Sequence, residues 1–193
     1  MEGSGNILFS GVGGQGILLA SEITAYSLLA AGFDAKKSEV HGMAQRGGSV
    51  TAQLRFGEKV YSPLIEPGSA DIQMAFEMME AVRYLPYLHG KSKVIVNTQK
   101  ILPPSVATGQ AKYPEDVLAH LTEKGIQVVA VDAFDIAGDV GEVKTANVVM
   151  VGVLSPFLPV AADIYEEVIR ARVPERFREV NLKAFAAGRK ISE

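Results

Sequence analysis

The residues best suited to chemistry form a short glycine loop close to the start of the chain. The loop fits the pattern G-x-G-x-x-G, follows an expected strand at residues 6–10 and opens an expected helix at residues 17–31. Glycines allow a close approach to a ligand, and the free N–H groups of a helix start attract a phosphate or another anion. We therefore predict a ligand-binding loop, and the alternative is that its glycines only allow tight strand–helix packing. The candidate binding residues are Gly11, Gly13, Gly14, Gln15 and Gly16.

A second candidate site is the polar loop at residues 41–49, which lies between two expected strands. It combines an imidazole, an amide, a guanidinium and two adjacent glycines. A guanidinium binds a carboxylate or phosphate through two parallel hydrogen bonds, and a Gly-Gly backbone can form a nest for an anion. Because ligands bind at strand ends in α/β sheets, we predict that this loop recognises an anion, and the alternative is a solvated turn. Its candidate binding residues are His41, Gln45, Arg46, Gly47, Gly48 and Ser49.

A few further polar positions carry weaker signals. Asn97 ends an expected strand and could line the same crevice, although a plain turn explains it equally well. The Gln15 amide can donate to a ligand or to a neighbouring chain. Asp132 and Asp135 could perform acid–base chemistry or hold a metal, but helix capping is the commoner role of such residues. We therefore predict no catalytic residue and no metal site in this chain.

One acidic residue raises the alternative of a dinucleotide site. Glu39 follows Gly16 by 23 positions, which is where a dinucleotide-binding sheet places the acid that binds ribose. However, little chain remains for a second mononucleotide half and a substrate domain, and no proton-transfer set such as a His–Asp pair is apparent. An independent NAD-type oxidoreductase, or a regulatory nucleotide sensor, stays open as the alternative function.

The elements expected around these loops predict one α/β domain over residues 1–193. A strand, the glycine loop, a helix and a second strand at residues 33–40 form the opening unit of a doubly wound sheet. We expect a single Rossmann-like domain with a mostly parallel sheet flanked by helices, a short β-hairpin and a helical C-terminal tail at residues 161–193. The hairpin is expected at residues 49–56 and 59–62, a loop at residues 135–145 and a buried helix at residues 148–154, ended by Pro156.

Composition narrows the class of protein. The chain has 193 residues, of which 48% are hydrophobic and 21% charged, as in an ordinary globular protein. Its net charge of −3 argues against a nucleic-acid partner. The lack of cysteine excludes iron–sulfur clusters held by thiolates of this chain. The apolar runs are far shorter than the ~20 residues that span a bilayer, so we expect a cytoplasmic protein with no membrane partner.

The two loops together carry a resemblance to a known family. GVGGQG after an N-terminal strand, followed by SEVHGMAQRGGSV, resembles the gamma-type domain of 2-oxoacid:ferredoxin oxidoreductases. Within that family, the second block is most similar to the small, beta-type subunits of the indolepyruvate branch. The resemblance extends over nearly the whole chain, including VVMVGVL at residues 148–154.

This resemblance implies a role in oxidative decarboxylation of a 2-oxoacid, such as an aryl-pyruvate, to an acyl-coenzyme A with reduction of ferredoxin. Thiamine diphosphate and iron–sulfur clusters would be held by a larger alpha-type subunit, with coenzyme A as co-substrate. The chain itself has no cysteine, and its nearest approach to a thiamine signature is Gly138-Asp139-Val140 rather than GDG. We therefore expect a non-autonomous small subunit of a heteromer. Its glycine loops would bind a ligand's phosphates or the partner's backbone, and ferredoxin would be reached through the complex.

Overall fold

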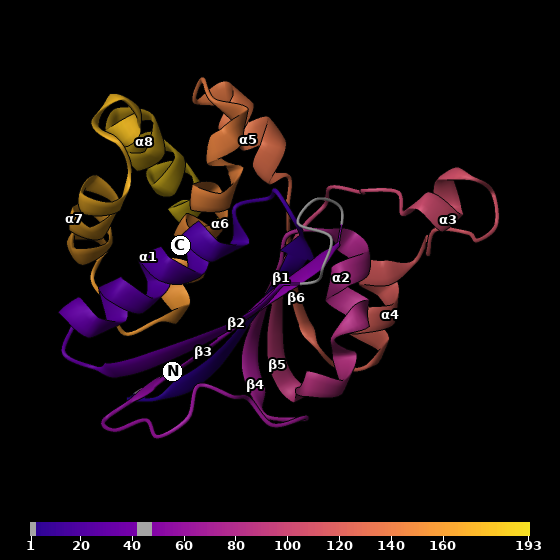
Figure 1. Ribbon diagram of the computed structural model, residues 1–193, viewed down its shortest axis with the longest axis horizontal. Helices are drawn as coiled ribbons and strands as arrows, with labels where there is room; N and C mark the ends of the chain where they lie inside the picture. Colours follow the sequence, from indigo (N-terminus) through magenta and orange to yellow (C-terminus); the bar gives the residue numbers. More distant parts are fainter. Residues whose placement is uncertain (1–2, 42–47) are drawn as a thin grey trace.

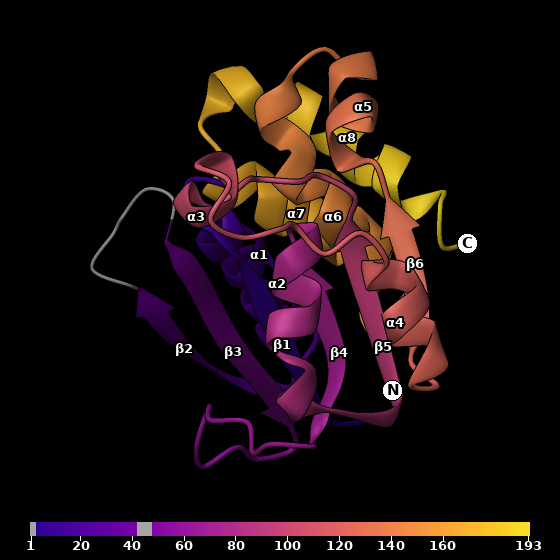
Figure 2. The same cartoon turned by 90° about the vertical axis from the view of Figure 1, so that its right-hand side faces the viewer.

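A six-stranded sheet runs through the molecule in the order β2-β3-β1-β4-β5-β6 (Figure 2). The computed structural model describes residues 3–41 and 48–193, except for the side chain of His41. β1 lies inside the sheet because its sequence, GNILFSGV, is buried along nearly its whole length. The strands are β1 (Gly5–Val12), β2 (Asp34–His41), β3 (Ser49–Gly57), β4 (Ala70–Ala75), β5 (Leu88–Asn97) and β6 (Gln127–Val131).

The sheet is mostly parallel, as expected. β1, β4, β5 and β6 run in one direction, whereas β3 pairs antiparallel with both β1 and β2. In this register Val12 at the end of β1 faces Ser49 at the start of β3. The sheet therefore brings the end of the glycine-loop strand beside the end of the second candidate loop.

Helices cover both faces of the sheet (Figure 1). One face carries α1 and the helices from α5 to α8, and the other carries α2 and α4. α3 projects from the body in the connection between β5 and α4. The α-helices are α1 (Ile17–Ala30), α2 (Met78–Arg83), α3 (Pro104–Ala107), α4 (Val117–Glu123), α5 (Ala133–Asp139), α6 (Ala146–Leu154), α7 (Ala162–Arg172) and α8 (Arg178–Arg189). Four 3-10 turns complete the chain: η1 (Leu85–Tyr87), η2 (Val143–Thr145), η3 (Ser155–Phe157) and η4 (Glu175–Phe177).

The apolar helix α6 is the centre of the helical side. Every residue of Ala146–Leu154 is buried, which explains why this segment shows no polar face. α8 packs on it so closely that a β-carbon added at Gly188 would lie 2.0 Å from the carbonyl oxygen of Val149. The reciprocal position, Gly152, would meet the carbonyl oxygen of Phe185 at 2.2 Å. Glycine at both positions is therefore what lets the two helix backbones touch.

Three details of the expected fold are wrong. Residues 59–62 do not form a strand, because the hairpin partner of β3 is β2. The expected loop at 135–145 is instead α5 and η2, a helical stretch that Asp132 begins by accepting a hydrogen bond from the Asp135 amide at 3.0 Å. The second strand does not pair with the first, because β3 lies between them. The expected buried helix at 148–154 is confirmed as α6, and the tail is helical.

Candidate functional site

The glycine loop lies where β1 ends and α1 begins, at the carboxyl edge of the parallel strands. Gly14 and Gly16 adopt φ angles of +103° and +77°, which side chains other than glycine rarely accept. Gly16 is the residue that caps α1. The loop therefore has the backbone geometry that its sequence predicts.

The glycines of this loop have different neighbours. A β-carbon at Gly11 would lie 2.8 Å from Gln15 Oε1 and 2.9 Å from the Phe76 side chain, and one at Gly16 would lie 2.5 Å from Asn147 Nδ2. Among the described residues other than its chain neighbours, a β-carbon at Gly14 would meet no atom within 4 Å. Gly11 and Gly16 thus serve close packing, whereas Gly14 faces open space and is available to a ligand or partner.

The Gln15 side chain holds the loop onto the neighbouring strands. Its Oε1 accepts from the Val12 amide at 2.8 Å, and its Nε2 donates to the Phe76 carbonyl and to Gln99 Oε1, both at 2.8 Å. Both N–H groups of the amide are used within the chain. The Gln15 amide, which was expected to donate to a ligand, therefore has both N–H groups bonded within the protein. Gln15 instead holds the glycine loop in its conformation.

The two sequence motifs meet in space. The Gly13 amide donates to the Gly48 carbonyl at 2.9 Å, and we call this contact the junction. Gly48 and Ser49 are the members of the second loop that the structure describes in full. The side chain of His41 and all of Gln45, Arg46 and Gly47 lie outside the described residues, so their predicted binding role stays a prediction.

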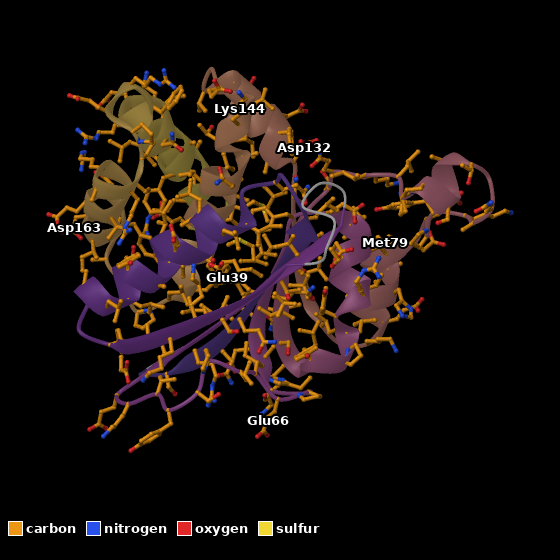
Figure 3. The ribbon with its side chains drawn as sticks, viewed as in Figure 1. Glu39, Glu66, Met79, Asp132, Lys144 and Asp163 are labelled. Carbon is orange, nitrogen blue, oxygen red and sulfur yellow. The ribbon has the colours of Figure 1, made fainter. Side chains whose placement is uncertain are left out.

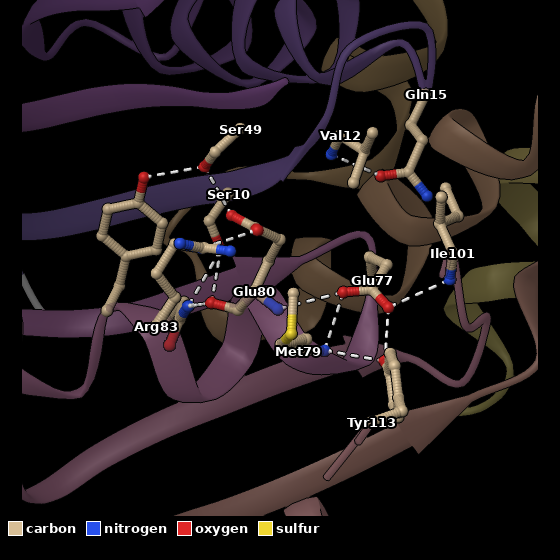
Figure 4. Close-up of polar contacts among 12 residues, drawn as sticks. Ser10, Val12, Gln15, Ser49, Glu77, Met79, Glu80, Arg83, Ile101 and Tyr113 are labelled. Carbon is tan, nitrogen blue, oxygen red and sulfur yellow. Dashed lines mark hydrogen bonds and ion pairs between the residues drawn. The ribbon is translucent and has the colours of Figure 1, made fainter. Parts of the chain in front are cut away.

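Ser49 is tied to α2 by a partly buried polar cluster (Figure 4). Its Oγ lies 2.6 Å from Glu80 Oε2 and 3.0 Å from the Tyr84 hydroxyl. The other oxygen of the Glu80 carboxylate accepts from Arg83 Nε at 2.8 Å. The Glu80 side chain is 3% exposed, whereas Arg83 is half-exposed. The start of β3 is thus fixed by a carboxylate that sequence reasoning did not single out, since nothing in the spacing of Ser49 and Glu80 predicts their contact.

A second buried glutamate, Glu77, joins three segments. Its Oε2 accepts from the Met79 and Glu80 amides at 2.7 Å and 3.1 Å, which caps α2. Its Oε1 accepts from the Ile101 amide at 3.1 Å and from the Tyr113 hydroxyl. Burial, together with the hydrogen-bonded Glu77 carboxylate, raises the pKa of Tyr113. Glu77 therefore fastens both ends of the projecting segment between β5 and α4.

Asn97 lies at the same edge, and its polar atoms are used within the protein. Its Nδ2 donates to the Phe76 carbonyl at 3.2 Å, and its Oδ1 accepts from the Ala133 amide at 3.1 Å. With 2% exposure it is buried beneath the loops rather than open to a ligand. Its contacts join the ends of β4, β5 and β6.

Three hollows surround the glycine loop. One of about 320 Å³ lies between Gly14, Phe134, Lys144 and Asn147. A second, of about 340 Å³, is lined by Gly13, Gly14 and the first residues of α1. A third, of about 410 Å³, is lined by Val12, Ser49, Glu80, Arg83 and the Leu102 segment. Gly14 thus lies between two hollows, and Lys144 is a cation beside the loop that sequence reasoning did not find (Figure 3).

Other groups bear on alternative chemistry. Glu39 lies on β2, where it faces Ala52 of β3 and is bonded to Lys37, and β3 separates it from the strand of the glycine loop.

Among residues 3–40 and 48–193, no three histidine or acidic side chains gather closely enough to hold a metal ion. No helix within the described residues is long and apolar enough to cross a membrane.

Comparison with known proteins agrees with this arrangement. The family model for pyruvate ferredoxin/flavodoxin oxidoreductase matches residues 6–191. The chain is 42% identical to the indolepyruvate oxidoreductase subunit IorB of Thermococcus kodakarensis, over 97% of this chain and 96% of that protein. It is 43% identical to the IorB subunit of Archaeoglobus fulgidus, over 95% of this chain and 92% of that protein.

Solved structures share the fold. The gamma subunit of a keto/oxoacid ferredoxin oxidoreductase from Geobacter sulfurreducens superposes with a TM-score of 0.72 and 26% identity, covering 97% of each chain. A 2-oxoglutarate:ferredoxin oxidoreductase from Magnetococcus marinus matches with a TM-score of 0.78 and 18% identity, covering all of this chain and 31% of that one, and so shows the fold alone. The sequence and the fold together place this chain in the pyruvate ferredoxin/flavodoxin oxidoreductase family.

Proposed function

We propose that this chain is the small subunit of a 2-oxoacid:ferredoxin oxidoreductase of the indolepyruvate type. The observation that carries the proposal is the junction, where the Gly13 amide bonds the Gly48 carbonyl beside the open Gly14. The glycine loop and the described residues Gly48 and Ser49 of the second motif lie together at the carboxyl edge of the sheet. The 42% identity to IorB over nearly the full length of both chains supports an aryl-pyruvate as the substrate class.

The chemistry of electron transfer belongs to a larger partner subunit in this proposal. The chain has no cysteine, so it offers no thiolate to an iron–sulfur cluster. Thiamine diphosphate and the clusters would supply decarboxylation and electron transfer from the partner, and ferredoxin would be reduced by the complex. The small subunit would contribute a binding surface rather than a reacting group.

Coenzyme A is the ligand that we assign to that surface. Its phosphates are anions, and the start of α1 offers free N–H groups and the positive end of a helix dipole. Lys144 adds a positive charge at the hollow that Gly14 lines. No atom of the described residues beyond its chain neighbours lies within 4 Å of a β-carbon at Gly14, which would allow a phosphate to approach the backbone.

The alternative, an independent NAD-type oxidoreductase or a nucleotide sensor, has weaker support. A dinucleotide site needs its ribose-binding acid on the strand next to the glycine-loop strand. In this sheet the strand next to β1 is β3, and β2, which carries Glu39, lies one strand further away. The Glu39 carboxylate bonds Lys37. The position at which an adenosine ribose would be held is therefore filled by a strand of the protein.

The test is reconstitution with the larger subunit from the same genome. The isolated chain should be colourless and inactive. The mixture should form a stable complex that reduces ferredoxin in the presence of indolepyruvate and coenzyme A, with pyruvate and 2-oxoglutarate as substrate controls. Full turnover by the large subunit alone would refute the proposal, and saturable NAD binding by the isolated chain would favour the alternative.

A further inference from the structure

The hydroxyl of Ser49 has no proton left for a ligand. Its Oγ lies 2.6 Å from Glu80 Oε2, and an ionised carboxylate only accepts, so the Ser49 proton is directed to Glu80. The Tyr84 hydroxyl, 3.0 Å away, is then the donor of the second bond. Ser49, which sequence analysis treats as a binding residue, therefore has its proton bonded to Glu80 and one acceptor lone pair bonded to Tyr84.

Glu80 is itself fixed from several directions. Arg83 Nε donates to its Oε1 at 2.8 Å. Its backbone carbonyl accepts from the Gln73 side chain at 3.0 Å, and Gln73 also donates to Ser10 on β1 at 2.9 Å. Gln73 and Ser10 are fully buried. A buried carboxylate without such partners would be costly, so its bonds to Ser49 and Arg83 have little freedom to break.

The bond from Glu80 to Ser49 acts directly on the junction. Ser49 follows Gly48, whose carbonyl accepts the Gly13 amide at 2.9 Å. It also faces Val12, the residue before Gly13, in the strand register. Any shift of Ser49 away from Glu80 would therefore change the distance between the two motifs.

We propose that Glu80 is a positioning residue, which acts through Ser49 to fix the start of β3 and thus the spacing of Gly48 from the glycine loop. The proposal deepens the proposed function, because the junction is the surface assigned there to coenzyme A. Glu80 touches no reacting atom in this account. It sets the geometry in which the backbone groups of both motifs are presented.

The first experiment measures the junction directly in the full-length chain. Ser49→Val removes the hydroxyl, whereas Ser49→Thr has nearly the same shape and keeps it. We expect the Gly13 amide to exchange with solvent about tenfold faster or more in Ser49→Val, as for loss of a hydrogen bond to a charged group, and at the wild-type rate in Ser49→Thr. Exchange of the α8 amides should stay unchanged in both variants.

The α8 amides and the Glu80→Gln variant distinguish a local effect on the junction from general destabilisation of the fold. Unchanged Gly13 exchange in Ser49→Val would overturn the proposal, as would an equal acceleration in α8, because the effect would then be general destabilisation. If Ser49→Val does not fold, Glu80→Gln replaces it, since that side chain has the same size without the charge. Its Gly13 amide should also exchange faster, and a wild-type rate would overturn the proposal.

The second experiment uses the reconstituted enzyme. We expect Ser49→Val to raise the KM for coenzyme A about tenfold with a smaller change in kcat, and Ser49→Thr to restore the wild-type KM. The double variant Ser49→Val/Glu80→Gln should be no worse than the more affected single variant, because Glu80→Gln weakens the same bond that Ser49→Val removes. Additive losses would overturn the proposal. A wild-type complex without 2-oxoacid-dependent activity would refute the proposed function instead, and the exchange result would still decide the role of Glu80.

Discussion

The side-chain amide of Asn147 fills the space that a β-carbon would need at Gly16. Its Nδ2 lies 2.5 Å from that position and donates to the Gly16 carbonyl at 3.2 Å. The start of α1 is thereby packed directly on α6, although the two residues are 131 positions apart in the chain. The last glycine of the motif is therefore required by a packing contact as well as by its backbone angle.

Gly16→Ala should destabilise the fold by about 2–3 kcal/mol, because it combines a strained φ with a clash against buried Asn147. Gly125→Ala is the matched control, since Gly125 has nearly the same φ, +76°, and open space around it. That control should cost only about 1 kcal/mol, for the left-handed backbone angle alone. Urea unfolding measures both, and equal losses would show that the Asn147 contact does not matter.

Gly14→Val should abolish activity of the assembled complex while the chain stays folded. The new side chain would stand in the open space between the two hollows and block approach to the backbone. Gly32→Val is the control, because Gly32 has a similar φ of +92°, equally open surroundings and a place at the far end of α1. Circular dichroism and ferredoxin reduction are measured on the same samples. Normal turnover in Gly14→Val would remove the loop from the binding surface.

Arg46→Lys tests the second loop at a residue that lies outside the described part of the chain. Lysine keeps the charge but loses the planar fork of the guanidinium. If Arg46 grips an anion, the variant should bind coenzyme A or the 2-oxoacid more weakly by about 1.5–3 kcal/mol. Weaker binding of the large subunit, with both small molecules unaffected, would assign Arg46 to the interface. Titration of all three against the variant distinguishes the outcomes, and no change in any of them would leave a solvated turn.

Tyr113→Phe should lower the free energy of unfolding at neutral pH by about 1–2 kcal/mol, because it removes the hydroxyl that Glu77 and the Met79 amide bind. Burial and the Glu77 carboxylate hold the pKa of Tyr113 above its ordinary value of about 10. The unfolded chain therefore loses this proton first as pH rises, and wild-type stability should fall above that value. The gap between wild type and variant should narrow in unfolding curves at alkaline pH. A constant gap would contradict this assignment.

The sequence predicted the parts of this fold that local patterns determine. The glycine loop, the buried apolar helix and most strands follow from periodicity and from glycine positions. The place of β3 between β1 and β2 did not follow, because nothing local distinguishes a strand that pairs with its chain neighbour from one inserted elsewhere. The helix α5 was missed because its segment shows little apolar periodicity, and its start depends on the single capping carboxylate of Asp132.

The sequence predicted the two motifs of the candidate site but not the residues that hold them in place. The spacing of glycines predicted a loop at a helix start, and Gly48 of the second loop does lie beside that loop. The contacts of Gln15, Asn97 and Ser49 with groups far along the chain decide which of their atoms remain free, and no pattern encodes such contacts. Glu77 and Glu80 look like ordinary helix residues in sequence, and only the fold shows that they are buried.

The sheet order also has a consequence for how the chain is made. β1 is an inner strand but precedes the other strands of this sheet in the chain, and its partner on one side, β3, is complete at Gly57. The hydrogen bond between Gly13 and Gly48 can thus form on a nascent chain that has not yet reached Glu80. Until β4 emerges, the other edge of β1 remains unpaired, and such an edge invites pairing with other chains. We therefore expect nascent chains that stop between Gly57 and Ala70 to aggregate readily, and chains extended beyond Ala75 to be protected.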